Sequence, residues 1–304
     1  MVEEEGQGNA FSNNYGNYCT VGYGKYQHYL NVNFIDSFEE VDGKPFSWDD
    51  YFPGYSSMTP EARSVYFLRN GLTDTEKTAM STYGADMSKY DALGNEVRLR
   101  AAYENRDPRL AAIAITPYST YDGGASGTVV TYTSRYPYRD WQAPSLDLRY
   151  GNNAYMLYPI RKFVTKGREY TNIGYNPVDV PIIRYADVLL SLAEAVNEQG
   201  RWQEAALLNA PGNTNTKVSG VEEMRARIRN EKKWELACEE QLYFEELRWG
   251  TWKTDKFVAK NGLQNVWGAP VYTYIWGGDA YLKWAIPQSE VEKNTNIKQN
   301  EGWN

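Results

Sequence analysis

The sequence predicts a mainly α-helical protein that carries long irregular loops and a few short β-hairpins. Residues 181–200 form the clearest helical pattern, and a second helical segment follows at once in 201–208. Residues 221–249 are long enough for one helix of about eight turns, or for two helices with a kink between them. Much of the rest is rich in Gly, Asn, Pro and Tyr without a helical period, which favours loops and turns.

The helix predicted over 181–200 has one continuous apolar face. Asp179 stands where an N-cap belongs, Pro181 lies close to the first helical position, and Gly200 ends the pattern. The small side chains in the apolar face let a neighbouring helix approach closely. We therefore expect a helix hairpin with 201–208 that needs further helices stacked on it to bury its face. The apolar positions recur at three- and four-residue spacing: Ala186, Leu189, Leu190, Ala193 and Val196.

The N-terminal part is predicted to begin as loop and short strand over residues 1–58, where no helical period is present. Three short helices should follow. The first begins after Thr59 with Pro at its first position, and the second opens with a capping box from Thr73 to Glu76. The third covers about Asn95 to Glu104.

The middle of the chain is predicted to change from helix to strand. Asp107 followed by Pro108 should break the third helix, and the apolar run 110–116 has the length of a strand. A hairpin is expected next, with 128–133 as its second arm.

Two further capping boxes are expected towards the C-terminus. Ser219 with Glu222 should open the helical segment 221–249. Ser289 with Glu292 should cap a short helix that follows Pro287.

Composition narrows the classes of function. The chain has 304 residues and a formal net charge of -7, which argues against a nucleic-acid partner because phosphate binding needs a clustered basic surface. No run of about 18 apolar residues is present, so the chain is not expected to span a membrane. The first residues, MVEEEGQGNAFSNN, show no signal peptide. We therefore expect either a cytoplasmic chain or a missing natural beginning.

The residues needed for most catalytic and metal chemistry are scarce. His28 is the one histidine, and no G-x-S-x-G motif, Walker loop or G-x-G-x-x-G motif is present. Cys19 and Cys238 lie far apart, and Cys238 is expected to be a buried structural thiol. The sequence therefore indicates no catalytic nucleophile, no metal site and no cofactor.

Aromatic content is the distinctive feature of the composition. The chain has 26 Tyr, 10 Trp and 9 Phe, yet its mean hydropathy is -0.66. Tyr and Trp combine a flat apolar face with a polar edge, which complements the apolar face and hydroxyl rim of a sugar ring. The alternative is that most of these rings fill an irregular core.

Six segments, which together cover about Leu30 to Asn304, carry the most specific patterns of the chain. The segments are SFEEVDGKPF, YENRDPRLAAIAIT, YPIRKF, IIRYADVLLSLAEAVNEQG, IRNEKKWELACEEQLYFEELRWG and YLKWAIPQSEVEKNTNIKQNEGWN. In this order they resemble motifs of the SusD/RagB family, the glycan-capturing outer-membrane lipoproteins that work beside TonB-dependent transporters. Glu240 stands where the family motif has Gly, and Leu242 stands where it has Arg.

The resemblance implies a SusD-like α superhelix of tetratricopeptide-like helix pairs that contact the transporter. It implies one domain over 1–304 that corresponds to the C-terminal part of a family member. Within it, 30–180 would be the loop-rich, ligand-facing region and 181–304 the helical signature region. The family's N-terminal helices and lipoprotein signal are not found in this sequence, so we expect a fragment. Its location would be the outer-membrane surface, with membrane contact only through a lipid anchor that this chain lacks.

The function implied is non-catalytic binding of a glycan and its delivery to a SusC-like TonB-dependent transporter, with peptide capture in some members. Family ligand sites have no fixed signature, so we choose site residues from local chemistry, as aromatic and polar clusters on loops. Trp234 and Trp249 are expected to be packing residues, and Trp303 is expected to dock the tail. The expected glycan-binding residues are Trp48, Asp50, Tyr51 and Tyr55 in one cluster and Tyr136, Tyr138, Arg139 and Trp141 in another.

A carboxylate-dependent glycoside hydrolase is the alternative from a different class. Such an enzyme needs two carboxyl groups about 5–10 Å apart. Asp49, Asp50 and Asp140 lie among aromatic residues, which is an environment that suits glycoside hydrolysis. Sequence neighbours do not establish a facing pair, so both hypotheses stay open at this point.

Overall fold

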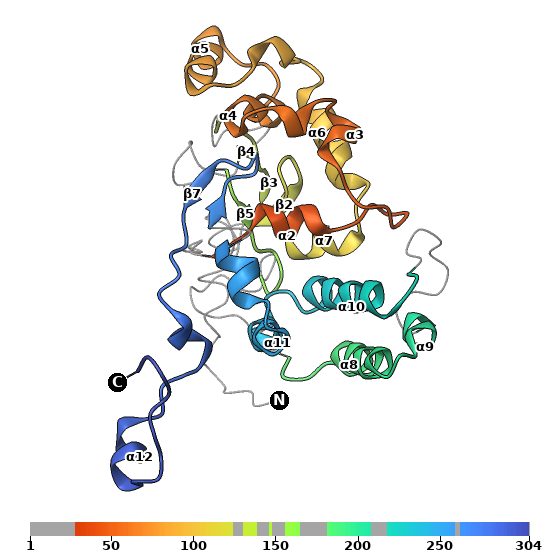
Figure 1. Ribbon diagram of the computed structural model, residues 1–304. Helices are drawn as coiled ribbons and strands as arrows, with labels where there is room; N and C mark the ends of the chain where they lie inside the picture. The colour runs from red at the N-terminus through yellow and green to blue at the C-terminus, as the bar shows by residue number, and fades with distance from the viewer. Residues whose placement is uncertain are drawn as a thin grey trace.

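The computed structural model describes residues 28–123, 130–138, 146–147, 156–164, 181–207, 218–258 and 262–303. Among these residues helices predominate, and the strands form only short ladders of two or three (Figure 1). The prediction of a mainly α-helical protein with a few short hairpins is therefore confirmed.

The first half of the chain is a set of short helices. Three of the predicted helix starts are confirmed. The Thr59 side chain accepts the Ala62 N–H, Thr73 and Glu76 form the expected capping box, and the third helix covers Asn95–Glu104. The helices are α2 (Val32–Ser37), α3 (Trp48–Tyr51), η1 (Tyr55–Ser57), α4 (Pro60–Arg63), η2 (Ser64–Phe67), α5 (Asp74–Tyr83), η3 (Met87–Lys89), α6 (Asn95–Glu104) and α7 (Pro108–Ile113).

The prediction that residues 1–58 contain no helix is wrong for α2 and α3. Each of these two helices has a side-chain N-cap: Asn31 accepts the Asn33 N–H at 2.8 Å, and Ser47 accepts the Asp49 N–H at 3.2 Å. Both helices are too short to show a period in sequence, and the burial of their apolar residues holds them in place.

The predicted strand 110–116 is also wrong. Asp107 accepts the Arg109 N–H as an N-cap, and Pro108 occupies the first helical position, so this pair starts α7. Only Ala114, just after the helix, forms a β-bridge, to Ile160.

Within the described residues, the strands make three small sheets. β1 (Tyr29–Leu30) pairs antiparallel with β5 (Tyr158–Pro159), and β6 (Leu263–Gln264) pairs antiparallel with β7 (Pro270–Tyr272). The third sheet contains the expected hairpin, because β2 (Thr120–Gly123) pairs antiparallel with β3 (Val130–Thr133) and β4 (Leu146–Asp147) joins β3 in parallel.

The second half of the chain contains the predicted helix hairpin. Figure 1 shows α8 (Tyr185–Glu198) beside α9 (Trp202–Leu207) and α10 (Val221–Glu235), which form one layered group. Ala193, Ala205, Met224 and Ile228 are buried between these three helices. The small side chains therefore allow the close approach that the sequence predicts.

The start of α8 differs from the prediction. The helix begins at Tyr185, four residues after Pro181, and Arg184 is its N-cap residue in an extended conformation. The Arg184 guanidinium donates to Glu235 and Glu239 at 2.8 Å each, which holds this residue outside the helix. Gly200 follows the helix with a φ of 80°, as expected of a glycine that ends a helix. Asp179 lies outside the described residues.

Two predicted capping boxes are not formed. Gly220 is the N-cap of α10, and Ser219 hydrogen-bonds to Glu223 where Glu222 was expected. The N-cap of α12 (Gln288–Lys293) is Pro287, which has no side chain that can accept a hydrogen bond.

The segment 221–249 contains two helices, α10 and α11 (Gln241–Trp249). Between them, Cys238 and Glu240 have positive φ values of 64° and 62°, where side chains other than Gly are strained. Cys238 is half-buried, and burial raises the pKa of its thiol to about 11, so it stays protonated near neutral pH.

Replacing Glu240 by Gly should stabilise the protein, because Gly adopts a φ of 62° without strain. We expect a gain of about 1 kcal/mol in the free energy of unfolding, measured by urea denaturation. Glu240→Ala keeps a Cβ atom at this φ and is the control. An equal gain from both variants would mean that the side chain, and not the backbone strain, sets the effect.

The C-terminal segment ends in two further short elements, η6 (Asp279–Leu282) and α12, after the π-helical turn η5 (Thr254–Val258). Trp303 donates from Nε1 to the carbonyl oxygens of Ala280 and Lys283 at 3.0 and 2.7 Å, so it docks the tail as expected. Figure 1 shows α12 projecting away from the rest of the molecule.

The main hydrophobic core lies between α2, α3, η2, α6 and the turn that joins β6 to β7. Trp234 belongs to it: its ring stacks on Phe38, and its Nε1 donates to Ser37 Oγ at 3.0 Å. The prediction that Trp234 is a packing residue is confirmed. Trp249 is half-buried and donates from Nε1 to Glu194 at 3.0 Å.

Candidate functional site

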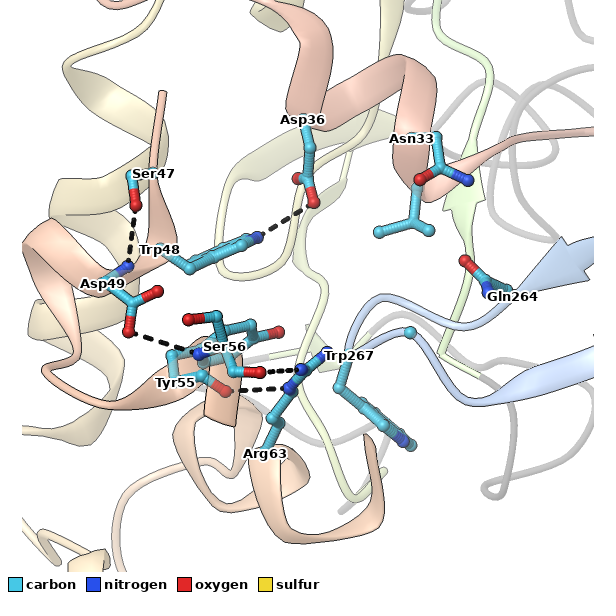
Figure 2. Close-up of a pocket in the computed structure, with 12 residues that line it drawn as sticks. Asn33, Asp36, Ser47, Trp48, Asp49, Tyr55, Ser56, Arg63, Gln264 and Trp267 are labelled. Atoms are coloured by element: carbon cyan, nitrogen blue, oxygen red, sulfur yellow. Dashed lines mark hydrogen bonds between the residues drawn. The ribbon is translucent and has the colours of Figure 1, made fainter. Parts of the chain in front are cut away.

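A cavity of about 370 Å³ opens where the first helices meet the β6–β7 turn. We call it the Asp36 cavity. Figure 2 shows side chains around it from α2, α3, η1 and α4, with Gln264 of β6 and Trp267 of the β6–β7 turn on the side away from Asp49. Its lining residues are Val32, Asn33, Asp36, Ser47, Trp48, Asp49, Tyr55, Ser56, Arg63, Gln264, Trp267 and Gly268.

Local capping explains how the short helices present these groups. The N-cap at Asn31 starts α2 so that Val32, Asn33 and Asp36 share one face of the helix. Asp49 Oδ1 accepts the backbone N–H of Ser56 at 3.2 Å, which ties η1 to α3.

Arg63 holds the loop of Tyr55 and Ser56 in place at the cavity. Its Nε donates to the carbonyl oxygen of Tyr55 and its Nη2 to that of Ser56, both at 2.9 Å. The guanidinium also lies 4.9 Å from the centre of the Tyr55 ring. Two of the three guanidinium nitrogens are therefore engaged with the loop.

Trp48 joins the cavity wall to the core. Its Nε1 donates to Asp36 Oδ2 at 3.1 Å. Its ring stacks on Phe52 and Tyr55, with centroids 6.0 and 5.3 Å away, and the edges of further rings pack around it. Trp48 is buried, so protein covers most of its ring although the residue lines the cavity.

Asp36 has an unusual electrostatic environment. Burial raises the pKa of its carboxyl group from 3.8 to about 6, although the hydrogen bond from Trp48 and the charges of Arg106 and Arg63 favour the ionised form. Its Oδ1 is buried and has no hydrogen-bond partner among the residues that the structure describes. The carboxyl group can therefore change its protonation state near neutral pH.

Asp36→Asn should stabilise the protein at alkaline pH. The folded chain holds the Asp36 proton more tightly than the unfolded chain, so the stability from this group is full below pH 3.8 and is lost as the pH rises through about 6. The side chain is partly exposed, so we expect a gain of about 1–2 kcal/mol at pH 8 and about none at pH 4. Asp74→Asn, at a carboxyl that is 98% exposed, is the control.

Unfolding by urea at both pH values measures this effect. A stability difference between Asp36→Asn and the parent chain that is the same at pH 4 and pH 8 would contradict the raised pKa.

The wall opposite Trp48 comes from a distant part of the sequence. In the β6–β7 turn, Asn265 N donates to Ala269 O at 2.9 Å, and Ala269 N donates to Asn265 Oδ1 at 2.8 Å. This closed turn presents Gln264 and Trp267 to the cavity, and Trp267 Nε1 donates to Tyr83 at 3.1 Å. Neither residue was predicted as part of the site, because nothing local in the sequence links them to the loop around residue 48.

The first predicted cluster is divided by the structure. Trp48 and Tyr55 line the cavity, but they are only 7% and 4% exposed, so the expectation that their rings project into water is wrong. Asp50 is exposed and lies outside the cavity lining. Tyr51 also lies outside it, with its hydroxyl group donating to Glu40 at 3.0 Å.

Of the second predicted cluster, only Tyr136 is shown to lie near the cavity wall, where it packs against Trp267. Tyr136 is 5% exposed, so its ring is also part of the core, with its centre 4.7 Å from that of Trp267. Tyr138 is half-buried. Arg139 and Trp141 lie outside the described residues, so their expected role stays a prediction.

Of the carboxyl groups considered for hydrolysis, Asp49 lines the cavity and Asp50 does not. Asp36 and Asp49 both line the cavity, but Figure 2 shows the indole of Trp48 between them, and one Asp49 oxygen is held by Ser56. The hydrogen bond from Ser56 lowers the pKa of Asp49. Asp140 lies outside the described residues. The arrangement suits hydrogen bonding to a ligand better than acid–base cleavage.

Within the described residues, no group of three or more His, Cys, Asp or Glu side chains could hold a metal ion. None of the described helices has the length and apolar character needed to cross a lipid bilayer.

Comparison with known proteins gives a consistent result. The model of the SusD family matches residues 3–303. The starch-binding protein SusD of Bacteroides thetaiotaomicron is 29% identical over 147 residues, which are 47% of this chain and 25% of that protein.

Solved structures extend the likeness to the fold. A SusD-like protein from Bacteroides fragilis aligns with a TM-score of 0.54 and 21% identity, over 90% of this chain and 46% of that one. A SusD-like carbohydrate-binding protein from the same species aligns with a TM-score of 0.47 and 21% identity, over 91% of this chain and 52% of that one. This chain spans about half the length of these solved relatives.

Proposed function

We propose that this chain, which belongs to the SusD family, binds a glycan without breaking any bond in it. The family match over nearly the whole chain carries the proposal, because a relative in this family is named for binding starch. The Asp36 cavity is the site that we propose for the ligand. It is concave, mixed in polarity and built on capped helices and a closed turn, as small-ligand sites commonly are.

The remaining features of the family are part of the same proposal. The protein would act at the surface of the outer membrane and pass its glycan to a SusC-like TonB-dependent transporter. Membrane attachment would be through a lipid anchor. Region 30–180 would supply most of the ligand site, and region 181–304 would supply the helical frame together with Gln264, Trp267 and Gly268 of the cavity wall.

Titration calorimetry of the whole chain against a panel of oligosaccharides tests the proposal. The neutral members are malto-, cello-, xylo- and manno-oligosaccharides, and the acidic members are oligogalacturonates and hyaluronan fragments. We expect binding heat with at least one of them and no release of reducing ends on prolonged incubation. Release of reducing ends would favour the hydrolase, and binding only to peptides would favour a peptide-capturing member of the family.

A further inference from the structure

The ring faces around the Asp36 cavity are not available to a ligand. Trp48 and Tyr55 stack on one another with their ring centres 5.3 Å apart, and both are buried. Trp267 is fully buried, with Phe67 and Tyr136 against it. A sugar in this cavity cannot lie flat on an aromatic platform, so polar groups must recognise it.

Two amide side chains on facing elements supply such groups. Asn33 on α2 and Gln264 on β6 line the cavity, and Figure 2 shows them on the side opposite Trp48. Both residues are half-buried, and neither side chain makes a hydrogen bond within the described residues. Each amide offers both a donor and an acceptor, which matches a hydroxyl group that can act as either.

The charges in the cavity disfavour an anion. Asp36 and Asp49 contribute two carboxyl groups, and Arg63 contributes one guanidinium, which already donates to two carbonyl oxygens. A ligand carboxylate would therefore meet like charges in a partly desolvated space, whereas a hydroxyl group can donate to Asp36.

The size of the cavity limits what enters it. At about 370 Å³ it lies near the lower end of the range of about 300–1,000 Å³ that is common for small-ligand sites. It suits the end of a glycan chain better than a long internal stretch.

We infer that the Asp36 cavity holds a neutral terminal sugar residue through hydrogen bonds between its hydroxyl groups and the side chains of Asn33, Gln264 and Asp36, and that it discriminates against acidic sugars. This inference rests on the proposed function, because it names the ligand class of the same site. Hydrogen bonds to sugar hydroxyl groups give strong selectivity, because a sugar that lacks one of these hydroxyl groups leaves a polar group of the site without a hydrogen-bond partner.

The experiment measures dissociation constants for the same neutral and acidic oligosaccharides. We expect a neutral oligosaccharide to bind at least about tenfold more tightly than either acidic one. The reason is that an unpaired charged group on the ligand weakens binding by about tenfold or more. For the neutral ligand, Asn33→Ala and Gln264→Ala should each weaken binding about three- to tenfold. Asp36→Asn should weaken neutral binding and reduce the discrimination against acidic ligands.

Controls separate folding from recognition. Asp74→Asn removes an exposed carboxyl on α5 and should leave every dissociation constant unchanged. Thermal unfolding of Asn33→Ala and Gln264→Ala should match the parent chain, because neither amide has a hydrogen bond within the described residues to lose.

The possible failures are distinct. Absence of binding to every oligosaccharide overturns the proposed function, and the inference falls with it. Neutral binding that is unchanged in both amide variants leaves the function standing and overturns the assignment to this cavity. Equal affinity for acidic and neutral ligands overturns the discrimination by Asp36.

Discussion

Trp48→Ala is expected to lower the free energy of unfolding by about 3–5 kcal/mol, as large-to-small substitutions of buried aromatic residues do. Trp48 is 7% exposed and packs against Phe52, Tyr55, Phe67 and Tyr103, so its removal leaves a void in the main core. It also removes the hydrogen bond to Asp36. Urea denaturation followed by circular dichroism measures the loss.

Two further variants make this result specific. Trp48→Phe keeps most of the ring contacts and loses the Nε1 hydrogen bond, so about 1–2 kcal/mol should be lost. Trp284→Ala removes an indole that is 68% exposed and should change stability by no more than about 0.5 kcal/mol.

The outcome decides between two interpretations of the same residue. If Trp48 were an aromatic platform in water, as the sequence suggested, Trp48→Ala would unfold like the parent chain and lose only glycan binding. A stability loss below about 1 kcal/mol would therefore contradict the packing seen in the core.

Sequence reasoning succeeded where the signal is local. The starts of α4 and α5 follow from one capping residue or one short motif each, and the glycine that ends α8 follows from its own conformational freedom. A cap is a contact between residues three apart, so it is visible without tertiary structure. The helix hairpin is equally local, because the short turn places α9 beside α8.

The burial of Trp48 could not be predicted in this way. The residue stands before two aspartates and close to Pro53 and Gly54, which is typical of an exposed loop. In α3 the helical turn sends Trp48 and Phe52 to the same buried side, while Asp50 stays exposed. Four residues are too few for this period to be recognised in sequence.

The Asp36 cavity is a tertiary feature. Asp36 and Gln264 are more than 200 positions apart, and only the docking of the β6–β7 turn brings them together. The resemblance of the chain to its family predicts the scaffold, but it transfers no ligand residues. The site therefore had to be found from burial, cavity shape and uncommitted polar groups.

Arg106→Ala is expected to cost about 3–5 kcal/mol of stability, because it leaves two carbonyl oxygens at the end of α2 unpaired and a void beside Phe46. Arg106 is 3% exposed. Its Nη2 donates to the carbonyl oxygens of Ile35 and Phe38 at 2.8 and 2.7 Å, and its Nε donates to Phe38 O at 3.2 Å. The guanidinium also stacks 3.4 Å from the centre of the Phe46 ring.

Arg106→Lys should restore little of the loss. A lysine ammonium is a point charge on a flexible stem and cannot reproduce the planar fork that reaches two carbonyl oxygens while stacking on a ring. Chemical denaturation of both variants beside the parent chain measures the difference. Full rescue by Lys would mean that charge alone, and not the geometry of the hydrogen bonds, stabilises this end of α2.

The same substitution links the core to the Asp36 cavity. The positive charge of Arg106 is one of the influences that favour the ionised form of Asp36, so its loss should raise the pKa of Asp36 above about 6. Titration of the Asp36 carboxyl carbon by NMR in Arg106→Lys, which keeps a positive charge, should show a smaller shift than in Arg106→Ala. If Arg106→Ala leaves this pKa unchanged, Arg106 supports the cavity by packing alone, and the electrostatics of Asp36 must be set by burial and Arg63.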